Sequence, residues 1–180
     1  MNFIHKVSKA YPKKSCVNLI NWFEDNTNLA VQGGSDIKKL NNLEINLILK
    51  QETDYFNLGK TLIKSIKNFK KAYPYVDKYM ARWNLNPSMQ LMKYEPNNYY
   101  DIIHCENTGS PEHFRRAFAF MIFLNDIKKG GGTKFLFQKS IIKPKAGDFY
   151  VWPAYWTHLH QGENAPKEKK YIITGWMEYI

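Results

Sequence analysis

Apolar residues recur at helical spacing in two stretches of the first half of the chain. In residues 12–24 they lie near one stripe, and Pro12 suits a helix start because its ring fixes a helical φ angle. In residues 54–72 the spacing recurs and ends before Tyr73-Pro74, because proline disfavours a helical conformation in the preceding residue. The pattern therefore predicts two helices. Their apolar stripes consist of Val17, Ile20, Trp22 and Phe23 in the first and of Tyr55, Leu58, Leu62, Ile63, Ile66 and Phe69 in the second.

Strand-like patterns dominate the second half of the chain. Short runs rich in aromatic and β-branched residues are separated by glycine, proline, asparagine or aspartate. The predicted strands cover residues 88–94, 99–105, 117–124, 134–138, 148–153, 156–160 and 171–178. Short strands separated by such turns favour a sandwich or a barrel.

One segment between the two predicted helices is ambiguous. Leucine and isoleucine alternate with polar residues over positions 43–49, which fits either a strand or the start of another helix. No repeat or low-complexity linker divides the chain. We therefore expect a single domain over residues 1–180, mainly β, in which residues 1–87 supply supporting helices and strands and residues 88–180 form the β core.

The composition fits a globular protein. With 180 residues, 44% apolar and 16% aromatic, the chain can bury one sizeable core, and no apolar stretch approaches the length of a membrane span. The two cysteines, at positions 16 and 105, do not form a disulfide framework, and the N-terminus does not resemble a signal peptide. We expect a reducing, cytoplasmic setting and no membrane partner.

The net charge of +10 comes from 26 basic and 16 acidic residues. Such an excess can favour a polyanion, because neutralised phosphates release counterions. The lysines are scattered, however, and their densest groups, residues 67–71 and 167–170, are short and form no stripe interleaved with aromatic residues. This charge is typical of a solvated surface, so nucleic acid is not the partner we expect.

His104 and Glu106 are the clearest candidates for a functional site in the sequence. In an extended segment, residues two positions apart face the same side, so both side chains can bind one ion while Cys105 faces away. A distant histidine would complete a set of two imidazoles and one carboxylate. That set occupies one face of an octahedral ion and leaves the other face open, which suits ferrous iron in oxygen-activating enzymes better than a structural zinc.

Two histidines are candidates for the third ligand. His158 and His160 are again two positions apart, so alternation along a strand would place them on the same side and cannot separate them. Both also have a plainer interpretation as polar residues on a solvated strand.

A series of motifs surrounds these residues. They are Tyr94-Glu-Pro-Asn-Asn-Tyr-Tyr-Asp-Ile-Ile-His-Cys-Glu106, Arg116-Ala-Phe-Ala-Phe-Met-Ile-Phe-Leu-Asn125, Gly130-Gly-Gly-Thr-Lys-Phe135, Lys143-Pro-Lys-Ala-Gly-Asp148, His160-Gln-Gly162 and Lys170-Tyr-Ile-Ile-Thr-Gly-Trp176. In this order, from about residue 88 to the C-terminus, the chain resembles the prolyl-4-hydroxylase-like branch of the iron(II)- and 2-oxoglutarate-dependent dioxygenases.

The resemblance implies a double-stranded β-helix, the jelly roll of cupin-like proteins, with the metal inside one open end. It implies Fe(II), 2-oxoglutarate and O2 as cofactor and co-substrates, with ascorbate as a further cofactor that such enzymes can use. The implied reaction hydroxylates a C–H bond and releases succinate and CO2. The implied iron ligands are His104, Glu106 and a distal histidine, for which the resemblance favours His160, because it precedes a basic residue, Lys170, by ten positions and is followed by Gln-Gly.

Lys170, Thr174 and Tyr94 are the candidates for binding the far carboxylate of 2-oxoglutarate. Lys170 opens an apolar run, where an inward-facing lysine needs an anion. Thr174 lies an even number of residues further on, so its hydroxyl can face the same pocket. Tyr94 precedes His104 by ten positions, as does a phenol that reaches this carboxylate in similar enzymes, although a core tyrosine is the plainer interpretation. His158 would then pack beside the site.

The remaining aromatic residues have structural interpretations. Trp176, Phe120 and Phe149 fit the core or a pocket wall, and Arg116 either forms a salt bridge to the site or is exposed. One departure from the pattern is Glu106, where most relatives have aspartate, because the extra methylene changes the backbone distance that iron binding requires.

Two loops have open interpretations. Residues 130–135 lack the Gly-Lys-Ser/Thr end of a phosphate-binding loop and resemble the turn between strands that the family has at this place. Residues 107–113 are polar and rich in turn formers, and they form either a pocket rim that contacts substrate or an ordinary loop.

The substrate does not follow from these patterns. A prolyl residue in a peptide or protein is the expectation that the resemblance favours, with a small molecule as the alternative. From a different class, a non-catalytic basic jelly roll that binds nucleic acid would need neither His104 nor Lys170. A metal-dependent isomerase is a third interpretation, and it leaves Lys170 without a role.

Overall fold

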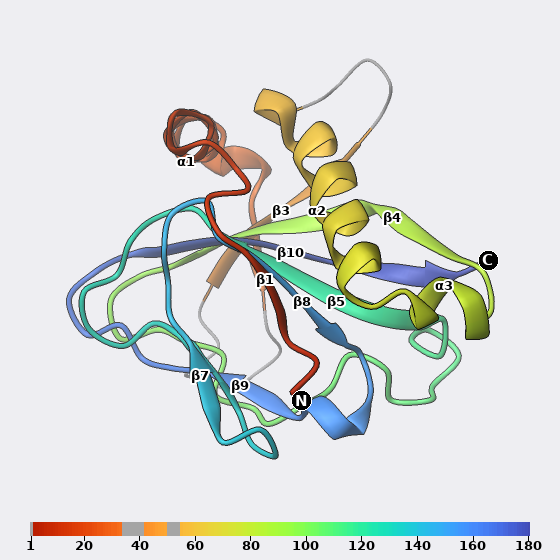
Figure 1. The fold of residues 1–180 in the computed structure, drawn as a ribbon. Coiled ribbons are helices and arrows are strands. Elements are labelled where there is room, and N and C mark those ends of the chain that lie inside the picture. Colours follow the sequence, from red (N-terminus) through yellow and green to blue (C-terminus); the bar gives the residue numbers. More distant parts are fainter. Residues whose placement is uncertain (1, 34–41, 50–54) are drawn as a thin grey trace.

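The computed structural model of the chain describes residues 2–33, 42–49 and 55–180 (Figure 1). Its α-helices are α1 (Lys13–Asp25), α2 (Leu58–Ala72) and α3 (Tyr75–Tyr79). Three short 3-10 turns lie at Thr27–Leu29, Tyr55–Asn57 and Trp156–His158. Within the described residues, no helix combines the length and the apolar character that crossing a membrane requires.

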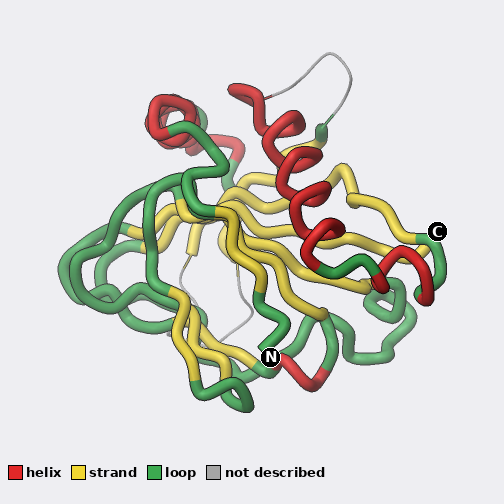
Figure 2. Tube along the Cα trace, viewed as in Figure 1, coloured by secondary structure: helices red, strands yellow, loops and turns green. Residues whose placement is uncertain are grey.

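The strands form two antiparallel sheets. The seven-stranded major sheet has the order β1 (His5–Val7), β8 (Phe149–Pro153), β5 (Arg116–Phe123), β10 (Lys170–Tyr179), β4 (Trp83–Tyr94), β3 (Asn42–Ile48) and β2 (Val31–Gly33). The three-stranded minor sheet has the order β7 (Ser140–Ile142), β6 (Thr133–Phe135) and β9 (His160–Gly162). Figure 2 shows the helices on one side of the major sheet and the minor sheet on the other.

Both faces of the major sheet are buried, in two separate hydrophobic clusters. On the helix side, Phe120 of β5 packs with residues of α1 and α2, among them Leu19 and Leu62. On the opposite side, Met121 of β5 packs with Phe135 of the minor sheet. Because successive side chains of β5 alternate between two buried faces, almost the whole strand is apolar. The second cluster forms the base of a pocket between the two sheets.

The two predicted helices are confirmed, but part of each predicted apolar stripe is wrong. In α1 the buried residues are Cys16, Leu19 and Phe23, whereas Val17 is 53% exposed. In α2, Leu62 is buried and the adjacent Ile63 is 55% exposed. Neighbouring helical residues differ by about 100° around the axis, so one residue of error moves a side chain from the core to the solvent.

The ends of both helices agree with the sequence signals. Pro12 is the N-cap of α1, and α2 ends at Ala72, before Tyr73-Pro74. The predicted start of the second helix, Asp54, lies outside the described residues, and the regular helix begins at Leu58. The ambiguous alternating segment is a strand, β3.

Most predicted strands of the second half are present, with changed bounds. Strand β4 begins at Trp83, so the expected border between the two regions, after residue 87, falls inside a strand. The short strands β1, β2 and β7 are additional. Residues 99–105 do not form a strand, because the segment pairs with the β9 region only at separated points, through Tyr100 and His104.

The predicted strand at 156–160 is also wrong. Residues 156–158 form a 3-10 turn, in which the amide of His158 donates to the carbonyl of Tyr155, and β9 begins only at His160. His158 and His160 therefore do not share a strand face. The observed architecture, two antiparallel sheets with helices packed on one outer face, nevertheless confirms the predicted mainly β class.

Candidate metal centre

The two histidines of the site come from segments far apart in the sequence. A pair of backbone hydrogen bonds, 3.0 Å and 2.9 Å long, joins His104 and His160 as an isolated antiparallel bridge beside β9. Their ring centroids lie 4.3 Å apart, and Tyr100 packs on the other side of the His104 ring at 4.5 Å. This bridge, and not a regular strand through residues 99–105, aligns the two imidazoles.

Backbone carbonyl groups fix the orientation of both imidazole rings. The Nδ1 atom of His104 lies 2.9 Å from the carbonyl oxygen of Ile102, and that of His160 lies 2.9 Å from the carbonyl oxygen of His158. A carbonyl oxygen can only accept a hydrogen bond, so each Nδ1 must carry its proton. In a neutral imidazole the lone pair is then on Nε2, the tautomer in which metal-binding histidines are commonly held.

Glu106 completes this group with one of its two oxygens. Its Oε1 atom lies 3.6 Å from the Nε2 atoms of both His104 and His160. This distance is too long for a hydrogen bond, so the three atoms face one another without bonding directly. One donor atom from each of the three residues lies within 4.8 Å of the others, an arrangement that could hold a metal ion.

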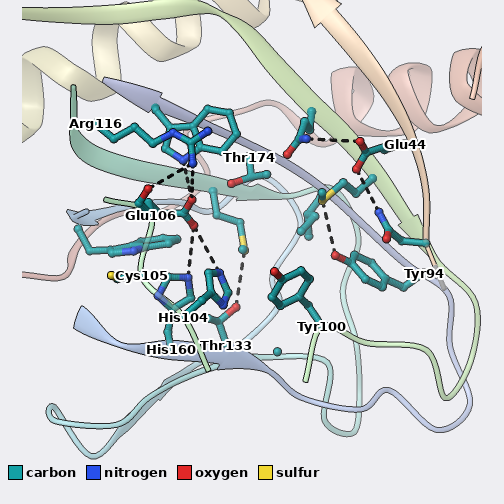
Figure 3. A pocket seen from close by; sticks show the side chains of 18 of the residues that line it. Glu44, Tyr94, Tyr100, His104, Cys105, Glu106, Arg116, Thr133, His160 and Thr174 are labelled. Atoms are coloured by element: carbon teal, nitrogen blue, oxygen red, sulfur yellow. Dashed lines mark hydrogen bonds and ion pairs between the residues drawn. The ribbon is translucent and has the colours of Figure 1, made fainter. Parts of the chain in front are cut away.

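The other oxygen of Glu106 is anchored by residues of the major sheet. The indole N–H of Trp176 in β10 donates a 2.7 Å hydrogen bond to Oε2. Arg116, at the start of β5, lies over the Trp176 ring at 3.8 Å, and its Nη1 atom lies 3.6 Å from Oε2 and donates to the Glu106 carbonyl oxygen. Figure 3 shows Arg116 on one side of Glu106 and the two histidines on the other.

The charges in this group are coupled. Burial by itself would raise the pKa of the Glu106 carboxyl, but the imidazoles of His104 and His160 hold it well below its ordinary value. Burial would lower the pKa of His104, and the Glu106 carboxylate outweighs that effect and raises it. Glu106 is therefore an anion at neutral pH, as a metal-binding carboxylate must be.

Trp176 is the site residue whose role the sequence did not indicate. It was expected in the core or in a pocket wall, and it does line the pocket, but it also binds the carboxylate. Its position six residues after Lys170 placed it on the same strand face as Lys170 and Thr174, which was the available indication. For Arg116, the salt-bridge interpretation is the correct one.

Lys170 is 4% exposed and faces the same pocket. Its amino group lies 4.5 Å from the centroid of the Tyr94 ring. Burial lowers the pKa of Lys170 to about 8, an effect that the charge of Glu163 only partly offsets. Among the described residues, none forms a salt bridge with this lysine.

Tyr94 and Thr174 line the same pocket as Lys170. The Tyr94 hydroxyl is 3.5 Å from the sulfur of Met92, a weak acceptor. The Thr174 hydroxyl donates its proton to the carbonyl oxygen of Phe120 at 3.0 Å, so it would have to rotate in order to donate to a ligand.

The pocket that contains all six predicted site residues has a volume of about 450 Å³. Several groups on its walls were not anticipated, including Thr133, the first residue of β6, and Trp152 of β8. The buried indole N–H of Trp152 has no hydrogen-bond partner within the described residues. Thr108 and His113 also line the pocket, so the loop of residues 107–113 contributes to its wall.

His158 has a different environment. Its Nε2 atom lies 2.9 Å from the carbonyl oxygen of Asn2, and its Nδ1 atom lies 3.0 Å from the Thr157 hydroxyl. Both ring nitrogens therefore have partners, and His158 links the 3-10 turn to the N-terminal segment.

Comparison with known proteins agrees with this geometry. The profile of the 2OG-Fe(II) oxygenase superfamily matches residues 89–178, half of the chain. The chain belongs to this superfamily. The resemblance seen in the sequence motifs is thereby confirmed, and the superfamily takes its name from 2-oxoglutarate and Fe(II).

One similar curated protein is "Probable prolyl 4-hydroxylase 9" of Arabidopsis thaliana. It is 26% identical over 148 residues, which cover 65% of this chain and 51% of that protein. The chain therefore spans about half the length of this relative.

Solved structures of prolyl hydroxylases have the same fold. The viral collagen prolyl hydroxylase of Paramecium bursaria Chlorella virus-1, in its 2-oxoglutarate complex, has a TM-score of 0.71 at 18% identity, covering 99% of this chain and 96% of that one. The prolyl hydroxylase of Trichoplax adhaerens, in complex with a hypoxia-inducible factor peptide, has a TM-score of 0.73 at 11% identity, covering 99% and 84%. These likenesses confirm the double-stranded β-helix.

Proposed function

We propose that this protein is an Fe(II)- and 2-oxoglutarate-dependent dioxygenase that hydroxylates a C–H bond. The overall reaction consumes one 2-oxoglutarate and one O2, inserts one oxygen atom into the substrate and places the other in succinate, with release of CO2. The observation that carries the proposal is the presence, in one pocket, of three converging metal donors and a buried lysine without a salt-bridge partner among the described residues.

The donor set fits iron. Two imidazole nitrogens with free lone pairs and one carboxylate oxygen are the ligands of the facial triad, which leaves coordination positions open. His104, Glu106 and His160 would hold the ion, and the iron supplies the activation of O2 when it is bound. Trp176 and Arg116 support this arrangement, because they hold the second carboxylate oxygen away from the position that Oε1 shares with the histidines.

The pocket also fits 2-oxoglutarate. A buried lysine is costly unless an anion compensates it, and the far carboxylate of the co-substrate would be that anion. Tyr94 packs against the lysine and has a hydroxyl bonded only weakly, so it can donate to the same carboxylate. Thr174 joins this pair after a rotation of its hydroxyl.

Trp152 also lines the pocket, and its buried indole N–H has no hydrogen-bond partner within the described residues. Members of the second apolar cluster, among them Met121, Trp152 and Ile172, line the same pocket, and an apolar wall of this kind strengthens the polar contacts beside it.

A prolyl residue in a peptide or protein is the substrate class that the relatives favour, since the Arabidopsis, viral and Trichoplax proteins are all named prolyl hydroxylases. The 107–113 loop, which contributes Thr108 and His113 to the pocket wall, is available to contact such a substrate. Ascorbate, which keeps iron ferrous, is the expected additional cofactor. Superfamily membership leaves the alternative, a nucleic-acid-binding module, without support.

The decisive experiment uses no knowledge of the substrate. Anaerobic addition of 2-oxoglutarate to the protein loaded with Fe(II) should give a weak visible charge-transfer band, and admission of O2 should then release succinate slowly. A protein that binds Fe(II) but neither binds 2-oxoglutarate nor releases succinate, and that holds nucleic acid in a salt-dependent manner, would overturn the proposal in favour of the binding module.

A further inference from the structure

The wall of the pocket opposite the metal donors carries a second carboxylate. Strand β3 alternates between the two faces of the major sheet: Ile45 and Leu47 pack in the helix-side cluster, and Asn42 and Glu44 line the pocket. Figure 3 shows Glu44 and Tyr94 on the side of the pocket away from Glu106. Glu44 is thus a pocket residue, although it belongs to the part of the chain from which only support for the sheet was expected.

Neutral groups alone contact the Glu44 carboxylate in the described part of the chain. The side-chain amide of Gln90 donates to Oε1 and that of Asn42 donates to Oε2, each over 3.4 Å. These hydrogen bonds are long and therefore weak. No lysine, arginine or histidine of residues 2–33, 42–49 and 55–180 forms a salt bridge with Glu44, so its charge is not neutralised there.

Glu44 is not the counter-ion of Lys170. Lys170 is paired across the sheet with Tyr94 and then Asn42, whereas Glu44 is paired with Met92 and then Ile172. With strands about 4.8 Å apart, the Cα atom of Glu44 lies roughly 10 Å from that of Ile172 and further from that of Lys170. The carboxylate whose charge acts on Lys170 is that of Glu163. Glu44 therefore does not neutralise Lys170, the lysine proposed to bind the far carboxylate of 2-oxoglutarate.

The negative charge of Glu44 nevertheless acts on groups inside the pocket. Burial raises the pKa of the Tyr94 hydroxyl, and the Glu44 carboxylate raises it further. The carboxylate thus lies within electrostatic reach of a fully enclosed pocket residue. A partly buried anion beside a substrate pocket attracts a cationic group and disfavours an anionic one.

We infer that Glu44 is a specificity-determining residue that selects substrates whose ammonium or guanidinium group reaches the pocket wall opposite the metal donors (Figure 3). This inference rests on the proposed function and narrows its substrate class. In a peptide the cation would be a lysine or arginine next to the target residue, and in a free amino acid it would be the amino group. The net charge of +10 would by itself attract anions, so the two effects predict opposite preferences.

Matched pairs of probes separate these possibilities. One pair is a proline-rich decapeptide with lysine beside each proline and the same peptide with Nε-acetyl-lysine. The other pair is L-proline and N-acetyl-L-proline. Binding is measured by calorimetry on the protein without iron, and turnover is measured as succinate released with Fe(II), 2-oxoglutarate and O2.

For the wild type, the cationic member of at least one pair should bind about tenfold more tightly and be turned over with a higher kcat/KM, and the pair that shows this identifies the source of the cation. Glu44→Gln, which keeps the shape of the side chain, should reduce that preference to less than about threefold. Asp25→Asn removes the same charge from the end of α1, an exposed position on the helix side, and should leave the preference unchanged.

Two results would overturn the inference: equal binding of both members of each pair by the wild type, or a preference that Glu44→Gln retains. The binding assay needs no catalysis, so a failure of the proposed function, seen as absence of succinate with every probe, is distinguishable from a failure of the Glu44 assignment.

Discussion

The hydrogen bond from Trp176 to Glu106 is the contact of the site whose removal is the most informative. Trp176→Phe deletes the indole N–H but keeps an aromatic ring beneath Arg116. The Glu106 carboxylate then loses its 2.7 Å anchor, and Arg116, 3.6 Å away, is too distant to replace it with a hydrogen bond. We predict that the variant folds normally and binds Fe(II) more weakly.

The size of this effect follows from two independent estimates. A hydrogen bond to a charged group contributes about 1.5–3 kcal/mol, equivalent to roughly 10- to 150-fold in an equilibrium constant. Alternatively, a released glutamate regains rotamer freedom of up to about 2 kcal/mol, which must be lost again when it binds the metal. Both estimates agree with the roughly 10- to 100-fold losses typical when a group that orients a metal ligand is removed. We expect a loss of metal affinity within that range.

Metal titration provides the assay. Anaerobic calorimetry gives the Fe(II) affinity, and Co(II), followed through its visible absorption, reports the ligand set without turnover. The matched control is Trp156→Phe, because Trp156 is 66% exposed and lies outside the pocket. Thermal unfolding of both variants monitors folding. If Trp176→Phe bound Fe(II) and Co(II) as tightly as Trp156→Phe and with an unchanged Co(II) spectrum, the anchoring role of the indole would be refuted.

Four further predictions follow from the same contacts. His160→Ala should abolish high-affinity Fe(II) binding while His158→Ala retains it, because both ring nitrogens of His158 already have partners; calorimetry showing the reverse would exchange the two assignments. Lys170→Ala should weaken 2-oxoglutarate binding at least about a hundredfold, since losing one partner of a buried charge pair costs roughly 3–5 kcal/mol, and unchanged affinity would remove Lys170 from the site. Burial lowers the pKa of Lys170 to about 8, and only the charged lysine binds an anion, so the affinity for 2-oxoglutarate should be full at lower pH and decline as the pH rises through 8. In Lys170→Arg, whose side chain stays charged, the affinity should not decline over this pH range. A wild-type affinity that is constant up to pH 10, or a decline that persists in Lys170→Arg, would contradict this. Leu62→Ala should lower the free energy of unfolding by about 2–5 kcal/mol and Ile63→Ala by less than about 0.5 kcal/mol, which denaturant titration of the two variants can compare.

The fold was predictable where a local pattern was long enough to be read. The apolar run of β5 and the helical spacing of α2 each extend over several periods, and both elements were placed within a few residues. Strands of three residues, such as β1 and β7, are shorter than two periods of alternation and leave no pattern. The pairing of the two sheets is a long-range property that no local pattern contains.

The distinction between His158 and His160 shows the same limit at the site. Alternation would place both side chains together, but the 3-10 turn at residues 156–158 separates them. The partner that helps to hold His158, the carbonyl oxygen of Asn2, is 156 residues away in the sequence. The spacing to Lys170 and the Gln-Gly that follows His160, both taken from the family resemblance, favoured His160, and the structure brings His160 together with His104 and Glu106.

The glutamate at position 106 and the tryptophan at position 176 are best understood as one feature. Glu106 uses its full length: Oε1 faces two imidazoles from one direction, while Oε2 accepts the Trp176 bond from the other. An aspartate at the same backbone position would be shorter by one methylene, about 1.5 Å, and could not make both contacts without a backbone shift. The departure from the usual aspartate therefore has a structural counterpart on β10. The His-x-Glu motif alone does not show whether the longer glutamate side chain is placed correctly for iron. Its placement depends on the Trp176 indole, which is seventy residues away in the sequence.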